Sequence, residues 1–80
     1  MNIDMARDVV RTGFRSASAL SELLPALKEG CSPAEYKAYA LGIAVAIDTI
    51  MTNTTGRVLE LYPNLGKEID EQIAKHGRYR

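Results

Sequence analysis

Apolar and small residues recur along the N-terminal half of the chain at alternating steps of three and four, the spacing of one face of an α-helix. The positions that follow this rule are Ile3, Ala6, Val10, Gly13, Ala17, Leu20, Leu24 and Leu27. The C-terminal half shows similar spacing, and nowhere do apolar and polar residues alternate one by one, as they would in a half-buried strand. The pattern therefore predicts an all-α chain.

Serine and proline residues divide this pattern into three predicted helices. Ser32 can accept the amide of Glu35, whose carboxylate can bond back to the Ser32 amide, and Pro33 fits the first helical position. Nothing after Pro33 breaks the helical spacing until Pro63. We predict helices at about 4–28, 33–62 and 65–76, the first two forming a long antiparallel hairpin.

The ends of the first and third helices carry further expectations. Pro25 removes one helical hydrogen bond, so we expect the first helix to kink or to end near Leu24. Asn64 can cap the third helix at its start, and Gly77 can close it. Beyond that helix, residues 77–80 form a short basic tail that need not be ordered.

The second predicted helix carries two lines of residues on nearly opposite sides. One line suits packing against the first helix and consists of Tyr36, Ala40, Ile43, Ile47, Ile50, Thr54, Val58 and Leu61. The other is apolar at its ends and polar at its centre, and consists of Leu41, Val45, Asp48, Thr52, Thr55 and Leu59. Because the third helix is too short to cover all of the second line, we expect a second copy of the chain to pack on its seam of Leu41, Val45 and Leu59. The expected fold is a homodimeric helical bundle, with a monomeric three-helix bundle as the alternative.

Asp48 is the single charged residue between Lys37 and Arg57. This bare segment is nearly long enough to cross a bilayer, but a carboxylate near its middle costs on the order of 3 kcal/mol there. We therefore interpret the segment as a packed helix and expect no membrane association. The first 14 residues contain Asp4, Arg7, Asp8 and Arg11, which is unlike the apolar region of a secretory signal.

A packed carboxylate needs a partner. In a straight antiparallel hairpin that turns near residues 30–31, Asp48 lies level with Gly13, between Arg11 and Arg15. The candidate polar cluster consists of Asp48, Thr52, Thr55, Arg11 and Arg15. It either fixes the register of an oligomer or lines a small-ligand pocket at a subunit interface, and the sequence leaves both alternatives open.

Basic residues suggest a second kind of partner. Arginines repeat every four positions in the first helix, and the tail adds more basic side chains around Tyr79; the set is Arg7, Arg11, Arg15, Arg78 and Arg80. Such a ridge could bind the phosphate backbone of a nucleic acid. Asp4 and Asp8, however, stand three residues before Arg7 and Arg11, the spacing of ion pairs on a solvated helix face.

Composition limits the remaining functions. The 80 residues form one domain, and their 10 basic and 10 acidic side chains cancel. Cys31 is the sole cysteine and His76 the sole histidine, so one chain has neither a disulfide nor a Cys/His zinc set. No phosphate-binding loop, Glu-x-x-His motif or nucleophile motif is present. We expect a cytoplasmic, non-enzymatic protein without catalytic residues, metal or cofactor, which binds itself and another protein.

Overall fold

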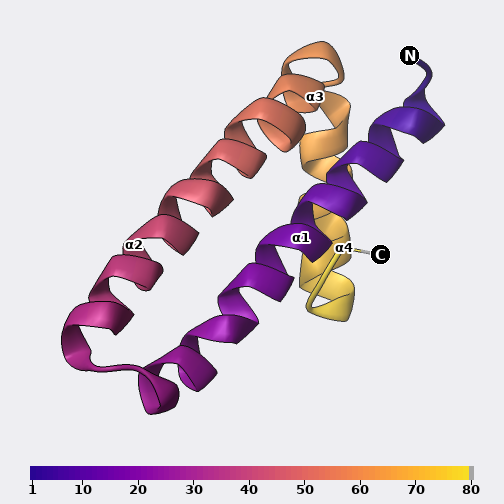
Figure 1. Cartoon of the computed structure of the whole chain (residues 1–80). Coiled ribbons are helices and arrows are strands. Elements are labelled where there is room, and N and C mark those ends of the chain that lie inside the picture. The colour runs from indigo at the N-terminus through magenta and orange to yellow at the C-terminus, as the bar shows by residue number, and fades with distance from the viewer. Residues whose placement is uncertain (80) are drawn as a thin grey trace.

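The computed structural model describes residues 1–79, and within that range the chain forms helices and no strand, which confirms the all-α prediction. The elements are α1 (Ile3–Gly30), α2 (Pro33–Ile50), the π-helix η1 (Met51–Thr55), α3 (Gly56–Leu61) and α4 (Asn64–His76). The α2, η1 and α3 elements continue one another and run antiparallel to α1 (Figure 1). Each predicted helix boundary lies within two residues of the observed one.

Local interactions explain where α2 begins and where α4 ends. At the start of α2, the hydroxyl of Ser32 accepts the amide of Glu35 at 3.2 Å, and the Glu35 carboxylate accepts the Ser32 amide at 2.9 Å. Gly77 ends α4 with a left-handed φ of 75°, a conformation that favours glycine. The prediction that Asn64 caps α4 is wrong, because Asn64 is its first residue and Pro63 occupies the cap position.

Pro25 does not end α1, which continues to Gly30. A proline in a helix leaves the carbonyl four residues earlier, here that of Ser21, without its usual donor. Ser21 and Pro25 are both exposed, so water can reach this part of the helix. The half-buried Leu24 and Leu27 on either side of the proline keep the segment packed, and an early end near Leu24 is therefore incorrect.

We call the long helix formed by α2, η1 and α3 the second rod, and α1 the first. The second rod contains a π-helical turn, near which side chains bond to the backbone. The hydroxyl of Thr49 donates to the Val45 carbonyl at 2.9 Å, and the side-chain amide of Asn53 donates to the Thr49 carbonyl at 3.0 Å. The hydroxyl of Thr54, the next residue, donates in the same way to the Ile50 carbonyl. These side-chain donors compete with the backbone donors of a regular α-helix, and such competition often distorts helices.

Gly56 closes the π-helical turn. Its amide donates to the carbonyl of Met51, five residues earlier, which is the defining bond of a π-helix. A Cβ atom at Gly56 would lie 3.2 Å from that carbonyl oxygen, so glycine suits this position. The turn rotates the residues that follow it relative to a regular helix, which changes the side that they face.

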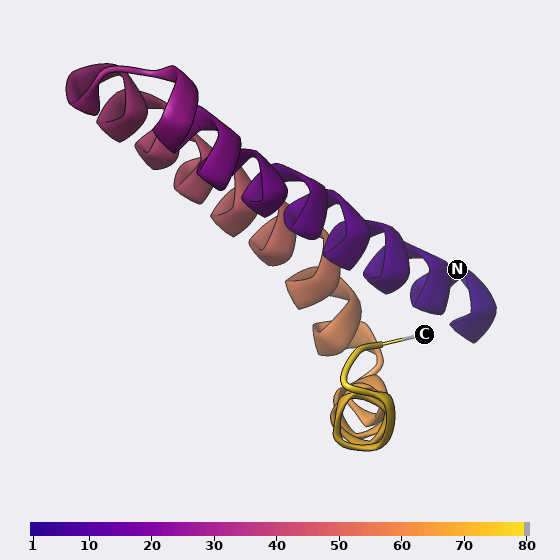
Figure 2. The ribbon, with the colours of Figure 1, turned by 90° about the horizontal axis from the view of Figure 1, so that it is seen from below.

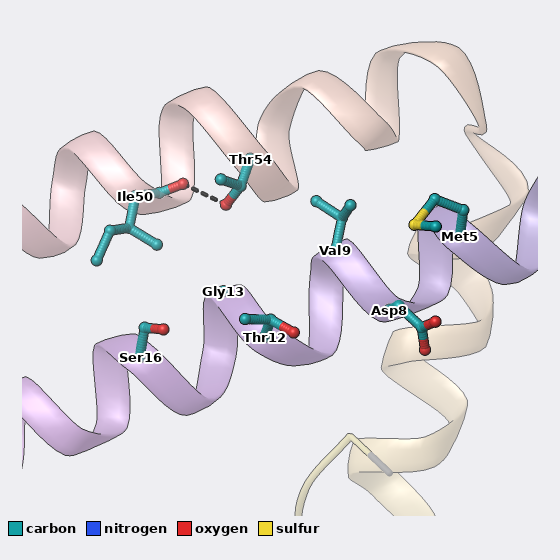
Figure 3. Close-up of a pocket in the computed structure, with 8 residues that line it drawn as sticks. All are labelled: Met5, Asp8, Val9, Thr12, Gly13, Ser16, Ile50 and Thr54. Carbon is teal, nitrogen blue, oxygen red and sulfur yellow. Dashed lines mark hydrogen bonds between the residues drawn. The ribbon is translucent and has the colours of Figure 1, made fainter. Parts of the chain in front are cut away.

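At Gly13, α1 lies close to the helix formed by α2 and η1, beside Ile50 and Thr54 (Figure 3). A Cβ atom there would lie 3.0 Å from the hydroxyl oxygens of both Thr54 and Thr55. Gly13 and Thr55 are buried. The absence of a side chain therefore sets the distance between α1 and η1.

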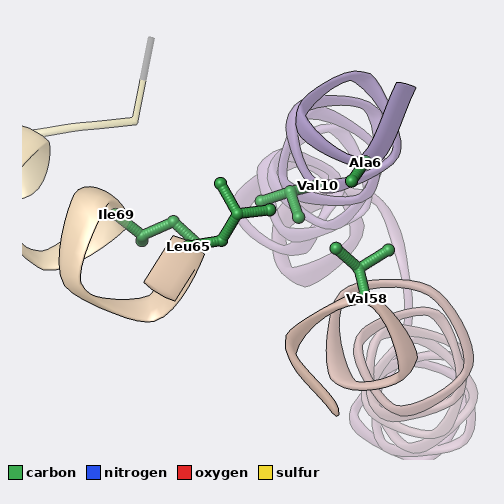
Figure 4. Close-up of a cluster of buried hydrophobic side chains, with 5 residues drawn as sticks. All are labelled: Ala6, Val10, Val58, Leu65 and Ile69. Atoms are coloured by element: carbon green, nitrogen blue, oxygen red, sulfur yellow. The ribbon is translucent and has the colours of Figure 1, made fainter. Parts of the chain in front are cut away.

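The hydrophobic core lies at one end of the molecule, where α1, α3 and α4 meet (Figure 4). Its buried members are Ala6, Val10, Val58, Leu65 and Ile69. By contrast, none of the 18 residues of α2 is buried. Figures 1 and 2 show that α4 lies on only one side of the hairpin and near only one of its ends. The other side, and the half of the hairpin near residues 31–32, lack a third layer.

Candidate functional site

The polar cluster predicted around Asp48 is not assembled. Asp48 and Thr52 are exposed, whereas Thr55 is only 4% exposed and lies on the inner side of the rod. Within residues 1–79, Asp48 has no ion-pair partner. Arg11 instead bonds to Asp8 at 3.2 Å, and Arg15 is exposed. The expected pair between Asp48 and Arg11 or Arg15 must therefore be corrected.

The register of the hairpin explains this difference. Gly13 lies beside Thr54 and Thr55, and not beside Asp48, six residues earlier. The register predicted from the sequence assumes straight helices with a constant rise of about 1.5 Å per residue and a sharp turn. The actual connection passes through extended backbone at Cys31 and Ser32, and the second rod contains a wider π-helical turn. Both features shift the pairing of residues across the hairpin.

The predicted dimer seam is only partly exposed. Leu41 and Val45 are 67% and 57% exposed. Leu59 instead packs against the core, and Thr55 is buried beside α1. The line from the sequence therefore ends at Thr52, because the π-helical turn rotates the residues beyond it inward.

The basic ridge is largely neutralised by carboxylates. Arg7 pairs with Asp4 and with Glu68, each at 3.1 Å, and Arg11 pairs with Asp8. Arg15 and Arg78 have no carboxylate partner among the described residues. Arg80 lies outside the described residues. The predicted set of Arg7, Arg11, Arg15, Arg78 and Arg80 thus does not form a continuous row of free cations in the described part.

Glu68 of α4 holds the C-terminal segment against α1, a feature that the sequence did not indicate. Both carboxylate oxygens accept the Nε–H of Arg7 at 3.2 Å, and one also accepts the hydroxyl of Tyr79 at 3.1 Å. The Tyr79 ring meets Phe14 edge to face with centroids 6.0 Å apart, and the Arg11 guanidinium lies 5.5 Å from that ring's centre. Residue 79 of the predicted tail is therefore packed and not free.

We expect Tyr79→Phe to lower the free energy of unfolding by about 1 kcal/mol, because it removes a hydrogen bond to Glu68 while keeping the ring. Urea unfolding followed by circular dichroism measures this loss.

Burial, and then the hydrogen bond to Glu68, raise the pKa of Tyr79 above its ordinary value of 10.0. The contribution of the protonated Tyr79 hydroxyl to the free energy of unfolding is therefore complete below pH 10, and it is lost as the pH rises through the pKa of Tyr79 in the folded state. In an alkaline absorbance titration, the wild type should therefore show a tyrosine that ionises at a raised pH, and Tyr79→Phe should not. If the variant still shows it, Tyr79 is not its source.

A groove lies between α1 and α2 on the side of the hairpin opposite α4 (Figure 3). It has a volume of about 420 Å³, and its lining includes Met5, Val9, Ser16 and Ile50. The one charged lining residue is Asp8, whose carboxylate already bonds to Arg11. The groove is therefore an apolar surface with hydroxyl groups and without a free charge.

Comparison of the chain with protein-family models, curated proteins and solved structures gives no match. Within residues 1–79, no cluster of three or more His, Cys, Asp or Glu side chains could hold a metal ion. In the same range, no helix combines the length and apolar composition that a bilayer-spanning segment requires.

Proposed function

We propose that this protein is a small non-enzymatic helical homo-oligomer that serves as a protein–protein interaction module of an adaptor or regulatory kind, located in the cytoplasm. The observation that supports this proposal is the distribution of burial: α2 has 18 residues and none of them is buried. Helices of globular proteins owe most of their stability to packing of an apolar face. A helix such as α2, rich in apolar residues yet covered only by α1, is suited to binding another helical surface.

Binding to nucleic acid has less support. Arg7 and Arg11 have carboxylate partners at 3.1–3.2 Å, so a phosphate would have to compete with them. The numbers of acidic and basic side chains are equal, so no overall charge attracts a polyanion. Recognition of a small ligand at Asp48 also has less support, because Thr55 is buried beside α1 and no ion pair among residues 1–79 joins Asp48 to Arg11 or Arg15.

The solution mass as a function of concentration tests the proposal. We expect the 8.8 kDa chain to sediment at twice that mass or more at micromolar concentration, and to dissociate on dilution. A folded species that remains at 8.8 kDa up to submillimolar concentration would contradict self-association. Circular dichroism on the same samples establishes that the helices are present in each case.

A further inference from the structure

We infer that the hairpin surface opposite α4 is the place where a second copy of this chain packs. We call this surface the uncovered face and define it by Met5, Val9, Thr12, Ser16 and Leu23 of α1 and Tyr39 and Ile50 of α2. This inference rests on the self-association proposed above and assigns it to a different surface from the seam of Leu41, Val45 and Leu59.

Helix geometry places these residues on one side of the hairpin. Residues two positions apart on a helix point about 160° away from each other. Met5 and Thr12 are therefore directed away from Arg7 and Phe14, which contact Glu68 and Tyr79 on the other side. Leu23 lies two turns beyond Ser16 and continues the stripe of the groove along α1.

The α2 side of the uncovered face follows from the same geometry. Tyr39 precedes Ile50 by three turns and so lies on the side of α2 that lines the groove. Met5, Leu23 and Tyr39 are 52%, 50% and 59% exposed. The uncovered face therefore presents large apolar side chains at both ends and a shallow groove between them.

The charge pattern favours an identical partner. In a two-fold dimer, the same patch meets itself, so an unpaired charge near the axis would face its own copy. Asp8 is the charged residue that lines the groove, and its carboxylate is paired with Arg11 at 3.2 Å. The α4 side of the hairpin differs, because the groove there is lined by four charged residues: Arg11, Arg15, Glu22 and Arg78. The uncovered face can thus pack on its own copy without bringing free like charges together.

The exposed area also fits a second copy. A compact monomer of this mass exposes about 4,800 Å², whereas the chain exposes 5810 Å². The excess of about 1,000 Å² is close to the roughly 800 Å² that each partner buries in a protein interface of standard size. Two hairpins packed through this face would supply four helices around a shared core, the arrangement of a helical bundle.

Leu23→Glu tests this assignment against the matched variant Val45→Glu. Leu23 lies on the uncovered face, whereas Val45 lies about 140° around α2 from Ile50, and both side chains are at least half exposed. We expect Leu23→Glu to raise the dimer dissociation constant by about 100-fold or more, because a glutamate would be buried without a partner. Val45→Glu should leave the dissociation constant within about threefold of wild type, because a change outside an interface seldom matters. Sedimentation equilibrium measures both.

A second variant, Tyr39→Glu, repeats the test on α2 in case Leu23→Glu disturbs α1, and circular dichroism verifies that each variant is folded. Weakening by both face variants and not by Val45→Glu supports the assignment. A dimer that survives both and dissociates in Val45→Glu overturns this inference and leaves the proposed homo-oligomer standing. A monomeric wild type overturns both.

Discussion

Leu65→Ala is expected to lower the free energy of unfolding by about 2–5 kcal/mol, the range measured for truncating a buried leucine. Leu65 is 2% exposed and belongs to the core cluster that also contains Val10 and Val58 (Figure 4). Its replacement leaves a cavity at the one place where α1, α3 and α4 meet. A chain of this length has a total stability of roughly 4–12 kcal/mol, so a large share would be lost.

Leu61→Ala is the matched control for this prediction. Leu61 is the last residue of α3, four positions before Leu65, and is 70% exposed, so its truncation should change the stability by no more than about 0.5 kcal/mol. Urea unfolding monitored by circular dichroism, at one protein concentration for all samples, gives both values. Equal losses in the two variants would show that the core is not centred on Leu65.

The helices could be predicted from the sequence because their boundaries depend on neighbouring residues. Ser32, Pro33 and Glu35 act within one turn, and the reciprocal bonds they predict are present at 2.9 and 3.2 Å. Gly77 likewise adopts the left-handed conformation expected at a helix end. Such local signals need no knowledge of the tertiary structure.

The positions of the side chains around the rods could not be predicted in the same way. A regular period of 100° per residue places Thr55 and Leu59 with Leu41 and Val45, but the π-helical turn separates them. The side chains of Thr49 and Asn53 donate to backbone carbonyls near this turn, and these bonds are visible only in three dimensions. A cluster of threonines and an asparagine before a glycine is a signal of weak helix, and it indicates where a regular period is least reliable.

Contacts between distant residues were beyond the reach of the sequence pattern. Arg7 and Glu68 are 61 residues apart, and no spacing rule joins them. The spacing of Asp4 and Asp8, three residues before Arg7 and Arg11, predicts local ion pairs, and the bonds of Arg7 to Asp4 and of Arg11 to Asp8 agree with it. The additional carboxylate comes from Glu68, and its position depends on how α4 packs, which the apolar residues of that helix do not determine.

The arrangement of the core gives the two halves of the molecule different roles. At one end, α4 and Tyr79 pack on α1 and stabilise the chain as a single unit. At the other end, the hairpin consists of two helices without a buried residue between Phe14 and Thr54. A two-helix segment this poorly covered gains the most from association, because packing of an apolar face is the main source of helix stability in proteins. The division supports placing the interaction surface on the hairpin.

Gly13→Val is expected to lower the free energy of unfolding by about 3 kcal/mol, the upper part of the range for adding volume to a packed site. The new Cβ atom would lie 3.0 Å from the hydroxyl oxygens of Thr54 and Thr55, both in the π-helical turn. Two further methyl groups would have to push α1 and the second rod apart. The gain from replacing glycine in a helix, about 0.5 kcal/mol for valine, is too small to offset this strain.

Gly42→Val separates the effect of crowding from that of helix propensity. Nothing lies within 4 Å of a Cβ atom at Gly42, which is also inside a helix, so the same substitution there should leave the stability unchanged or raise it by about 0.5 kcal/mol. Urea unfolding of the two variants side by side measures the difference, which we expect to be about 3 kcal/mol. Similar stabilities for the two would mean that α1 does not approach the second rod closely at Gly13. The expected opposite response follows because Gly13 serves as a spacer between helices, whereas Gly42 faces open space.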